Sequence, residues 1–312
     1  MPEGLKGFDS AAEIVDLDGE TMGTFWRIRA AVPAQFDRAG LQRAAQSRLD
    51  GLVAEMSHWD AQSLLSRFNR APGGVWHPLP ADFAQVIAAG VAIAERSGGA
   101  FDPAIGRLTD LWGLGPNAAE GAPVEQALAI ARAQSGWQRL ALDQSATRLR
   151  QPGGLWLDLS GIAKGFAADA LADLLATHGV LHCLAEVGGE CVGRGLRPDG
   201  DPWWVEAEMP EGFPAPPLRI ALHQLAVATS GDYLAGAHTL DPVTGRPAIH
   251  STTAVTVVHR RCMEADAWAS ALCVLPFDAA CSLVEREDLA VRILTRAGGE
   301  WLSPALGRML QD

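Results

Sequence analysis

The segment Leu157-Asp158-Leu159-Ser160-Gly161-Ile162-Ala163-Lys164-Gly165 sets a carboxylate, a hydroxyl, two glycines and a lysine in an apolar frame. Alternating leucines over 155–159 predict the end of a strand, and the apolar residues that follow recur at helical spacing up to Gly179. A strand-to-helix junction with glycines presents backbone N–H groups, which suit a phosphate or a metal–phosphate group. The alternative is an ordinary helix start capped by Asp158 or Ser160, and the segment alone does not choose.

On both sides of this junction, the predicted helices and strands follow one another without regular alternation. Helical spacing predicts helices over 41–56, 83–94, 123–136, 263–275 and 279–286. Short apolar runs predict strands over 139–143, 147–150, 155–159, 182–187, 203–208, 218–222, 225–229 and 253–259, and a final hairpin turning at Gly298-Gly299. Residues 1–20 are expected to be an irregular lead-in, followed by one domain over 21–312. The absence of a βαβ pattern favours an α+β fold with largely antiparallel strands.

Composition limits the class of protein. The 312 residues carry 25 basic and 37 acidic side chains, a net charge of −12, which disfavours a nucleic acid or an anionic membrane as partner. No apolar run reaches the roughly 18 residues that a membrane span needs, and the first residues lack the features of a signal peptide. The five cysteines are odd in number without C-x-x-C spacing, so we expect reduced thiols and a cytoplasmic location.

A metal site is suggested by one pair of side chains. Asp266 and Ser270 lie one helical turn apart and so share a helix face. One carboxylate and one hydroxyl make a modest oxygen site for Mg²⁺, an ion that often combines one or two protein carboxylates with substrate phosphates. The alternative is an exposed aspartate beside a neutral serine. Common nucleotide-binding, hydrolase and zinc-protease fingerprints are absent from the sequence.

Several further segments resemble, in their order along the chain, the ApbE family of FAD:protein FMN transferases. They are Met22-Gly23-Thr24, Ser57-His58-Trp59-Asp60, Ser66-Arg67-Phe68-Asn69, Gly99-Ala100-Phe101-Asp102-Pro103, Val187-Gly188-Gly189-Glu190, Ala228-Thr229-Ser230-Gly231-Asp232-Tyr233, His238-Thr239-Leu240-Asp241-Pro242-Val243-Thr244-Gly245 and Met263-Glu264-Ala265-Asp266. With the 157–165 segment, the resemblance extends from Met22 to about Leu275. It implies a single compact α+β domain with packed helices around a central flavin cleft.

The resemblance also implies roles for individual residues. Asp266, Ser270 and the backbone carbonyl of Gly161 correspond to metal ligands, although the family usually has threonine at position 270. Positions expected to contact the flavin dinucleotide are Met22, Trp59, Ala100, Phe101, Asp102, Asp158, Lys164 and Leu240. Trp59 stands where tyrosine is common, and its indole still offers a flat stacking face. Lys164 can neutralise a phosphate as a point charge.

The catalytic base stays undecided at this stage. His238 falls near the reacting phosphates in the family pattern, and either His238 or Asp241 is expected to help deprotonate an acceptor hydroxyl. A lone histidine is also often structural, and the segment Asp241-Pro242-Val243-Thr244-Gly245 is a good turn signature.

The function that the resemblance implies is Mg²⁺-dependent transfer of FMN from FAD, the substrate, to a threonine hydroxyl of an acceptor protein, with release of AMP. One alternative is a metal-dependent FAD pyrophosphatase that yields FMN and AMP, because water can replace the acceptor. Another is an FAD-binding protein without catalysis. We expect a monomer or a small homo-oligomer.

Overall fold

A computed structural model describes residues 6–119, 121–143, 145, 147–231 and 239–310. Its centre is an eight-stranded sheet in the order β1-β2-β6-β7-β10-β13-β14-β15, in which every neighbouring pair is antiparallel. The strands are β1 (Glu13–Thr21), β2 (Thr24–Val32), β6 (Cys183–Val187), β7 (Glu190–Arg194), β10 (Leu225–Gly231), β13 (Thr252–His259), β14 (Ala290–Thr295) and β15 (Glu300–Leu302). The predicted α+β class with largely antiparallel strands is confirmed.

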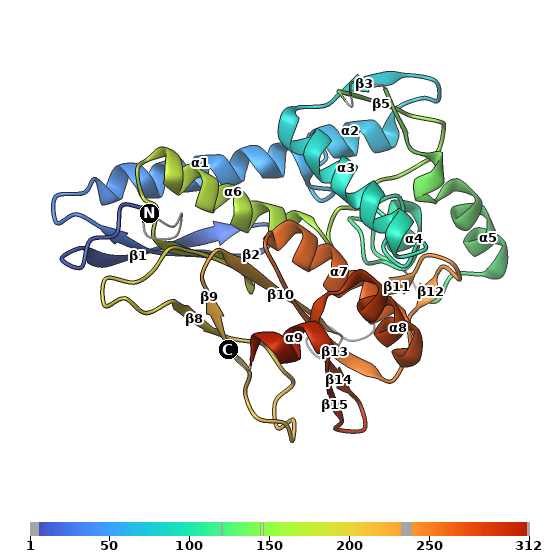
Figure 1. The fold of residues 1–312 in the computed structure, drawn as a ribbon. Coiled ribbons are helices and arrows are strands. Elements are labelled where there is room, and N and C mark those ends of the chain that lie inside the picture. Colours follow the sequence, from blue (N-terminus) through green and yellow to red (C-terminus); the bar gives the residue numbers. More distant parts are fainter. Residues whose placement is uncertain (1–5, 120, 144, 146, 232–238, 311–312) are drawn as a thin grey trace.

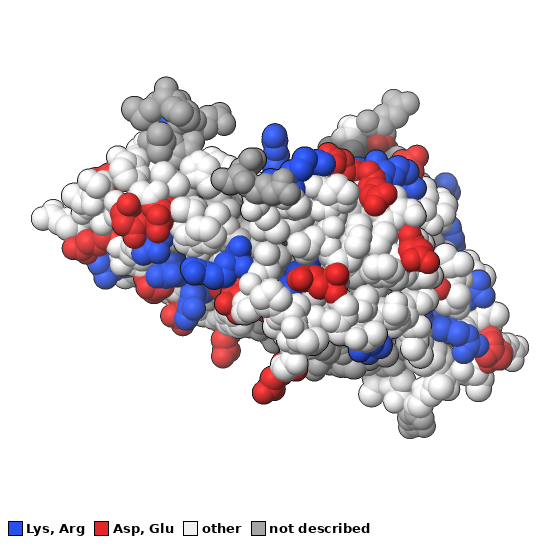
Figure 2. Space-filling model, turned by 60° about the horizontal axis from the view of Figure 1, so that its bottom comes forward, with Lys and Arg blue, Asp and Glu red and all other residues white. Residues whose placement is uncertain are grey.

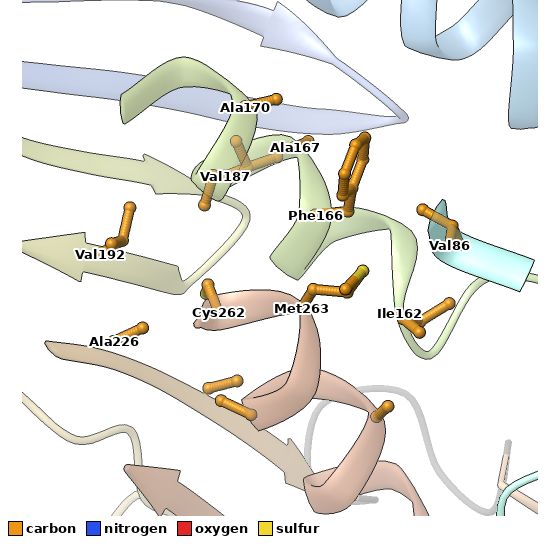
Figure 3. Packing of buried hydrophobic residues seen from close by; sticks show 14 of the residues in the cluster. Val86, Ile162, Phe166, Ala167, Ala170, Val187, Val192, Ala226, Cys262 and Met263 are labelled. Atoms are coloured by element: carbon orange, nitrogen blue, oxygen red, sulfur yellow. The ribbon is translucent and has the colours of Figure 1, made fainter. Parts of the chain in front are cut away.

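Three helices cover one face of this sheet: α1 (Arg38–Met56), α6 (Ala163–Thr177) and α7 (Cys262–Val274) (Figure 1). Helices α6 and α7 pack together in the main apolar core, which includes Phe166 and Ala167 from α6 and Cys262 and Met263 from α7 (Figure 3). Gly165 permits this contact, because a Cβ there would lie 2.3 Å from the Cys262 carbonyl oxygen. The two helices therefore approach closely at their first turns.

A second group of helices lies beyond one end of the sheet, toward the right of Figure 1. It comprises α2 (Leu64–Arg70), α3 (Ala81–Arg96), α4 (Gly106–Leu111) and α5 (Glu125–Gln134), with a small sheet of β3 (Trp76–Pro78), β5 (Arg148–Arg150) and β4 (Ala141–Leu142) and a 3₁₀ turn, η2 (Trp137–Arg139). A hairpin, β11 (Leu240–Asp241) and β12 (Arg246–Pro247), packs beside α4 and α5.

The opposite face of the main sheet has a smaller apolar cluster. It is covered by the hairpin of β8 (Trp203–Glu206) and β9 (Arg219–Leu222) and by α9 (Pro304–Met309), while α8 (Phe277–Glu287) leads into β14. On the face shown in Figure 2, basic and acidic side chains are interspersed among uncharged residues. Within the described residues, no helix is both long and apolar enough to cross a membrane. None of the five cysteines forms a disulfide.

The expected irregular lead-in is wrong over its second half, because Glu13–Thr21 forms the edge strand β1. Its inward residues Val15 and Leu17 are buried, and Asp16 and Asp18 alternate with them on the exposed side. Aspartate is uncommon in strands, so these residues obscured the alternation of buried and exposed positions in the sequence. Sequence analysis also missed β2 and β7.

The predicted strand over 155–159 is also wrong. The segment is mostly buried but has no regular secondary structure, and its hydrogen bonds go to side chains and loops instead of a neighbouring strand. The Asn69 side chain donates to the Leu157 carbonyl (3.0 Å) and accepts from the Leu157 N–H (2.7 Å). Gln151 binds both backbone groups of Leu155 in the same way. The side-chain amides thus make the hydrogen bonds that the backbone of a neighbouring strand would make in a sheet. The chain therefore reaches the start of α6 without joining a sheet of the described residues.

Candidate active site

A cavity of about 420 Å³ lies where the starts of α6 and α7 meet the end of β10. Nine predicted site residues line it, and they come from four separate parts of the chain: Ala100, Phe101, Asp102, Asp158, Gly161, Lys164, Leu240, Asp266 and Ser270. Glu190 and Glu208 also line this cavity. The fold therefore brings together most of the set that the sequence suggested.

The candidate metal ligands line the cavity where α6 and α7 approach each other. Asp266 is 2% exposed, and its Oδ2 accepts a hydrogen bond from the Gly165 N–H at 2.9 Å. Burial raises the pKa of Asp266, although the Lys164 ammonium and the Gly165 N–H oppose the shift. Ser270 follows on the same face, and a Cβ on Gly161 would lie 2.7 Å from the Ser270 Oγ.

This donor set is suited to Mg²⁺. A carboxylate, a hydroxyl and the close backbone of Gly161 offer hard oxygen atoms, and they leave room for substrate phosphate and water in the coordination shell. Within the described ranges, no group of three or more His, Cys, Asp or Glu side chains forms a cluster suited to a metal. The described residues that line the cavity include no cysteine or histidine, the ligands typical of zinc sites.

Lys164, expected to meet a phosphate, lines the cavity but already has a partner. Its Nζ donates to Glu190 Oε1 at 2.7 Å, and Glu190 is 3% exposed. Burial alone would lower the pKa of Lys164, but the carboxylates of Glu190, Asp266 and Glu208 outweigh it and raise that pKa. Burial and the nearby Asp266 in turn raise the pKa of Glu190. The Lys164 ammonium therefore stays charged, and its ion pair with Glu190 holds it beside the cavity. Sequence analysis quoted Glu190 in a motif and assigned it no role.

Asp158 is held by donors on two sides. Its Oδ1 accepts from the Ser160 N–H at 2.9 Å and from the Ser160 Oγ at 2.5 Å, and the Nδ1 of His58 lies 3.3 Å from the same oxygen. Burial would raise the pKa of Asp158, but His58 and Ser160 outweigh it and lower that pKa well below its usual range. The capping alternative is wrong, because α6 begins at Ala163 with Ile162 as its N-cap and has no side-chain cap hydrogen bond, whereas Asp158 binds the Ser160 N–H before the helix.

Asp102 and Phe101 line the same cavity. The Asp102 carboxylate accepts from the N–H groups of Ala104 (2.8 Å) and Trp137 (3.0 Å). Burial raises the pKa of Asp102 to about 6, and these hydrogen bonds oppose the shift. Phe101 is 6% exposed and belongs to the main apolar core as well as to the cavity wall. Its core and ligand-contact interpretations are therefore compatible.

Met22 and Trp59 lie on a neighbouring cavity of about 170 Å³, which shares Ser160 and Lys164 with the main one. Met22 has a φ of 50°, an uncommon conformation for a residue with a side chain, in the turn between β1 and β2. Trp59 is 64% exposed, and its ring lies 5.1 Å from that of His58. An exposed aromatic face at the entrance suits ring stacking.

Of the two candidate bases, His238 and Asp241, the structure describes Asp241. His238 lies outside the described residues. Asp241 is not among the described residues that line the cavity, although its neighbours Leu240 and Pro242 are. Its Oδ1 accepts from the Val243 N–H at 2.9 Å and its carbonyl from the Gly245 N–H at 2.7 Å. Asp241 therefore forms the turn that the sequence also suggested.

Known proteins match this chain over most of its length. A model of the ApbE family matches residues 22–293. The FAD:protein FMN transferase of Klebsiella pneumoniae (strain 342) is 34% identical over 96% of this chain and 92% of that protein. The Escherichia coli (strain K12) FAD:protein FMN transferase is 34% identical over 94% of this chain and 88% of its own length.

Solved structures show the same similarity in three dimensions. The flavin transferase ApbE from Vibrio cholerae superposes with a TM-score of 0.88 at 31% identity, covering 95% of this chain and 99% of that one. The apo form of the Pseudomonas stutzeri flavinyl transferase ApbE gives a TM-score of 0.90 at 31% identity, covering 96% and 98% of the two chains.

Proposed function

This chain belongs to the ApbE family, and from that membership we infer that it is a transferase that moves FMN from FAD onto an acceptor protein. The observation that carries the proposal is the single cavity on which Asp158, Lys164, Gly161, Asp266 and Ser270 meet. Proteins named FAD:protein FMN transferase match nearly the whole chain, which supports the same activity here.

We further propose that the reaction depends on Mg²⁺ and that the acceptor group is a threonine hydroxyl. Asp266, Ser270 and the Gly161 carbonyl would hold the ion, which when bound would neutralise charge on the FAD pyrophosphate and act as a Lewis acid. The hydroxyl oxygen forms a new bond to the phosphorus of the FMN half, the pyrophosphate P–O bond breaks, and AMP leaves with the electron pair.

The residues of this chain contribute mainly positioning and charge, as in other phosphoryl transfers. The Lys164 ammonium, fixed by Glu190, places one positive charge beside the cavity. Asp158 offers an ionised oxygen to a hydrogen-bond donor on the dinucleotide. The acceptor hydroxyl must lose a proton, and His238 and Asp241 remain the two proposed bases. Asp241 would have to leave its turn hydrogen bond to serve.

An assay with FAD and Mg²⁺, with and without a threonine-bearing acceptor, tests the proposal. Transfer predicts AMP release together with covalent flavin on the acceptor. FMN and AMP formed equally without acceptor would favour the pyrophosphatase alternative, and flavin binding without turnover would favour a binding protein. The cytoplasmic location and the monomeric or small oligomeric state remain predictions from the sequence.

A further inference from the structure

Asp158 contacts a histidine, His58, from a distant part of the chain. His58 lies just after α1, which ends at Met56, yet its Nδ1 is 3.3 Å from Asp158 Oδ1. Both side chains are about nine-tenths buried, at 10% and 8% exposed. Asp158 lines the main cavity, whereas His58 lines the 170 Å³ cavity and another of about 250 Å³. The imidazole therefore contacts the carboxylate from the side away from the main cavity.

The hydrogen bonds to this carboxylate are uneven. In the described part of the chain, the Ser160 N–H, the Ser160 hydroxyl and the His58 ring all converge on Oδ1. This anchoring fixes one oxygen and leaves Oδ2 as the oxygen for a ligand. Ser160 belongs to the same short loop as Asp158, whereas His58 connects this loop to the chain just after α1.

The charges of the pair support each other. Burial alone would lower the pKa of His58, but the Asp158 carboxylate outweighs it, Asp110 adds to the effect, and the pKa is raised. An ionised carboxylate accepts hydrogen bonds and cannot donate them. Asp158 is therefore suited to hydroxyl or N–H groups of a ligand and is unsuited to groups that only accept.

We propose that His58 is a positioning residue for the flavin dinucleotide, which fixes Asp158 as an acceptor-only carboxylate with Oδ2 toward the cavity and thereby sets the affinity for FAD. The inference rests on the proposed function, because FAD is the ligand only under that function. The groups that it selects are sugar or ribityl hydroxyls and the imide N–H of a flavin ring. His58 also packs against Trp59, so one dipeptide supports both Asp158 and an exposed aromatic face.

Titration of FAD by flavin fluorescence, without acceptor and before any AMP appears, measures the effect. His58→Ala is expected to raise the Kd about tenfold, or about 1.4 kcal/mol. His58→Gln keeps a neutral donor of similar reach, so it restores most of the affinity at the alkaline end of the pH range, where His58 itself is neutral. The matched control is His77→Gln on β3, where the histidine packs against Phe68 and lies on neither the main cavity nor its neighbours. It should leave the Kd unchanged.

A pH series between about 6 and 8.5 separates positioning from simple packing. Asp158 and Asp110 act on the charge of His58, Arg70 and Lys164 share a cavity with it, and Asp60 follows it by two residues. Asp102 and Glu190 titrate on the main cavity. The useful quantity is the ratio of the His58→Gln and wild-type Kd values, in which these other groups cancel. We expect about fivefold at the acidic end, the difference between a charge-assisted and a neutral hydrogen bond. The ratio should fall toward one as His58 loses its proton.

Two results would overturn the inference. One is a ratio that stays constant with pH. The other is an equal effect of His58→Ala in wild-type and Asp158→Asn backgrounds, since a residue that acts through Asp158 must lose its effect there. The histidine ring-proton titration gives a ligand-independent check, because the His58 pKa should fall in Asp158→Asn. If wild type binds no FAD, the proposed function fails; if it binds FAD and these differences are missing, only this inference fails.

Discussion

Replacing Lys164 with alanine should have two separable consequences, one for folding and one for FAD. The side chain is 35% exposed and pairs with Glu190, whose side chain is 4% exposed. Its removal leaves a buried carboxylate without its ammonium partner. A fully buried pair broken in this way costs about 3–5 kcal/mol of the free energy of unfolding, and the partial exposure of Lys164 places the expected loss nearer 2 kcal/mol. FAD affinity should fall separately by about 1.5–3 kcal/mol, the value of a hydrogen bond to a charged group.

The pH dependence of this loss follows from Glu190. Its pKa is already raised in the folded protein, and without the ammonium it should rise further. An acid whose folded pKa exceeds its unfolded pKa loses stability as pH rises between the two values, because the folded state then binds more protons. Lys164→Ala should therefore be less destabilised at pH 5 than at pH 8, as measured by urea unfolding.

A double variant separates the two consequences. Lys164→Ala with Glu190→Gln removes the unpaired carboxylate and should recover most of the unfolding free energy, while FAD binding should stay weaker than in wild type. Riboflavin, which has no phosphate, should bind all of these variants about equally. Equal losses for riboflavin and FAD, or no recovery of stability in the double variant, would refute the reasoning.

Two further predictions concern the ligand and the metal set. FAD should bind more tightly than FMN in a fluorescence titration, because the expected ligand contacts extend over two cavities that share Ser160 and Lys164, with Phe101 on the main cavity and Met22 and Trp59 on its neighbour; equal affinities would show that the adenylate half is not recognised. Ser270→Thr should leave the rate of AMP release equal or higher, since threonine keeps the oxygen and stiffens its rotamer; a large loss would mean that the space beside Gly161 cannot hold the extra methyl group.

The sequence was sufficient for elements whose periodicity is strong and local. The apolar spacing over 83–94 predicted α3, and the Gly98-Gly99 pair predicted its end, where both glycines have positive φ. Edge strand β1 was missed because its exposed side is acidic. The segment 155–159 has a strand pattern, but Asn69 and Gln151 satisfy its backbone, and a single local window does not contain those partners.

In the candidate site, too, local motifs predicted some features, and contacts between distant residues were missed. Short motifs were enough to choose nine residues that the fold places on one cavity. The contacts that modify their chemistry were missed, because His58 pairs with Asp158 across 100 positions and Glu190 pairs with Lys164 across 26. Both residues stood inside quoted motifs, yet a motif gives residue types and spacing without the ion pairs that folding creates. For Asp241, the local turn signature predicted the observed contact better than the catalytic role did.

The most direct test of the central claim is AMP release by Asp266 variants in Mg²⁺. Asp266 is the only charged member of the proposed metal set, and it also accepts the Gly165 N–H, so Asp266→Asn serves beside Asp266→Ala as the variant that keeps an acceptor oxygen. Both should bind FAD within about tenfold of wild type, or about 1.4 kcal/mol. AMP release should fall at least about a hundredfold, because charge stabilisation by the metal is worth several kcal/mol. Normal AMP release from a folded Asp266→Ala protein would contradict the metal assignment and the mechanism built on it.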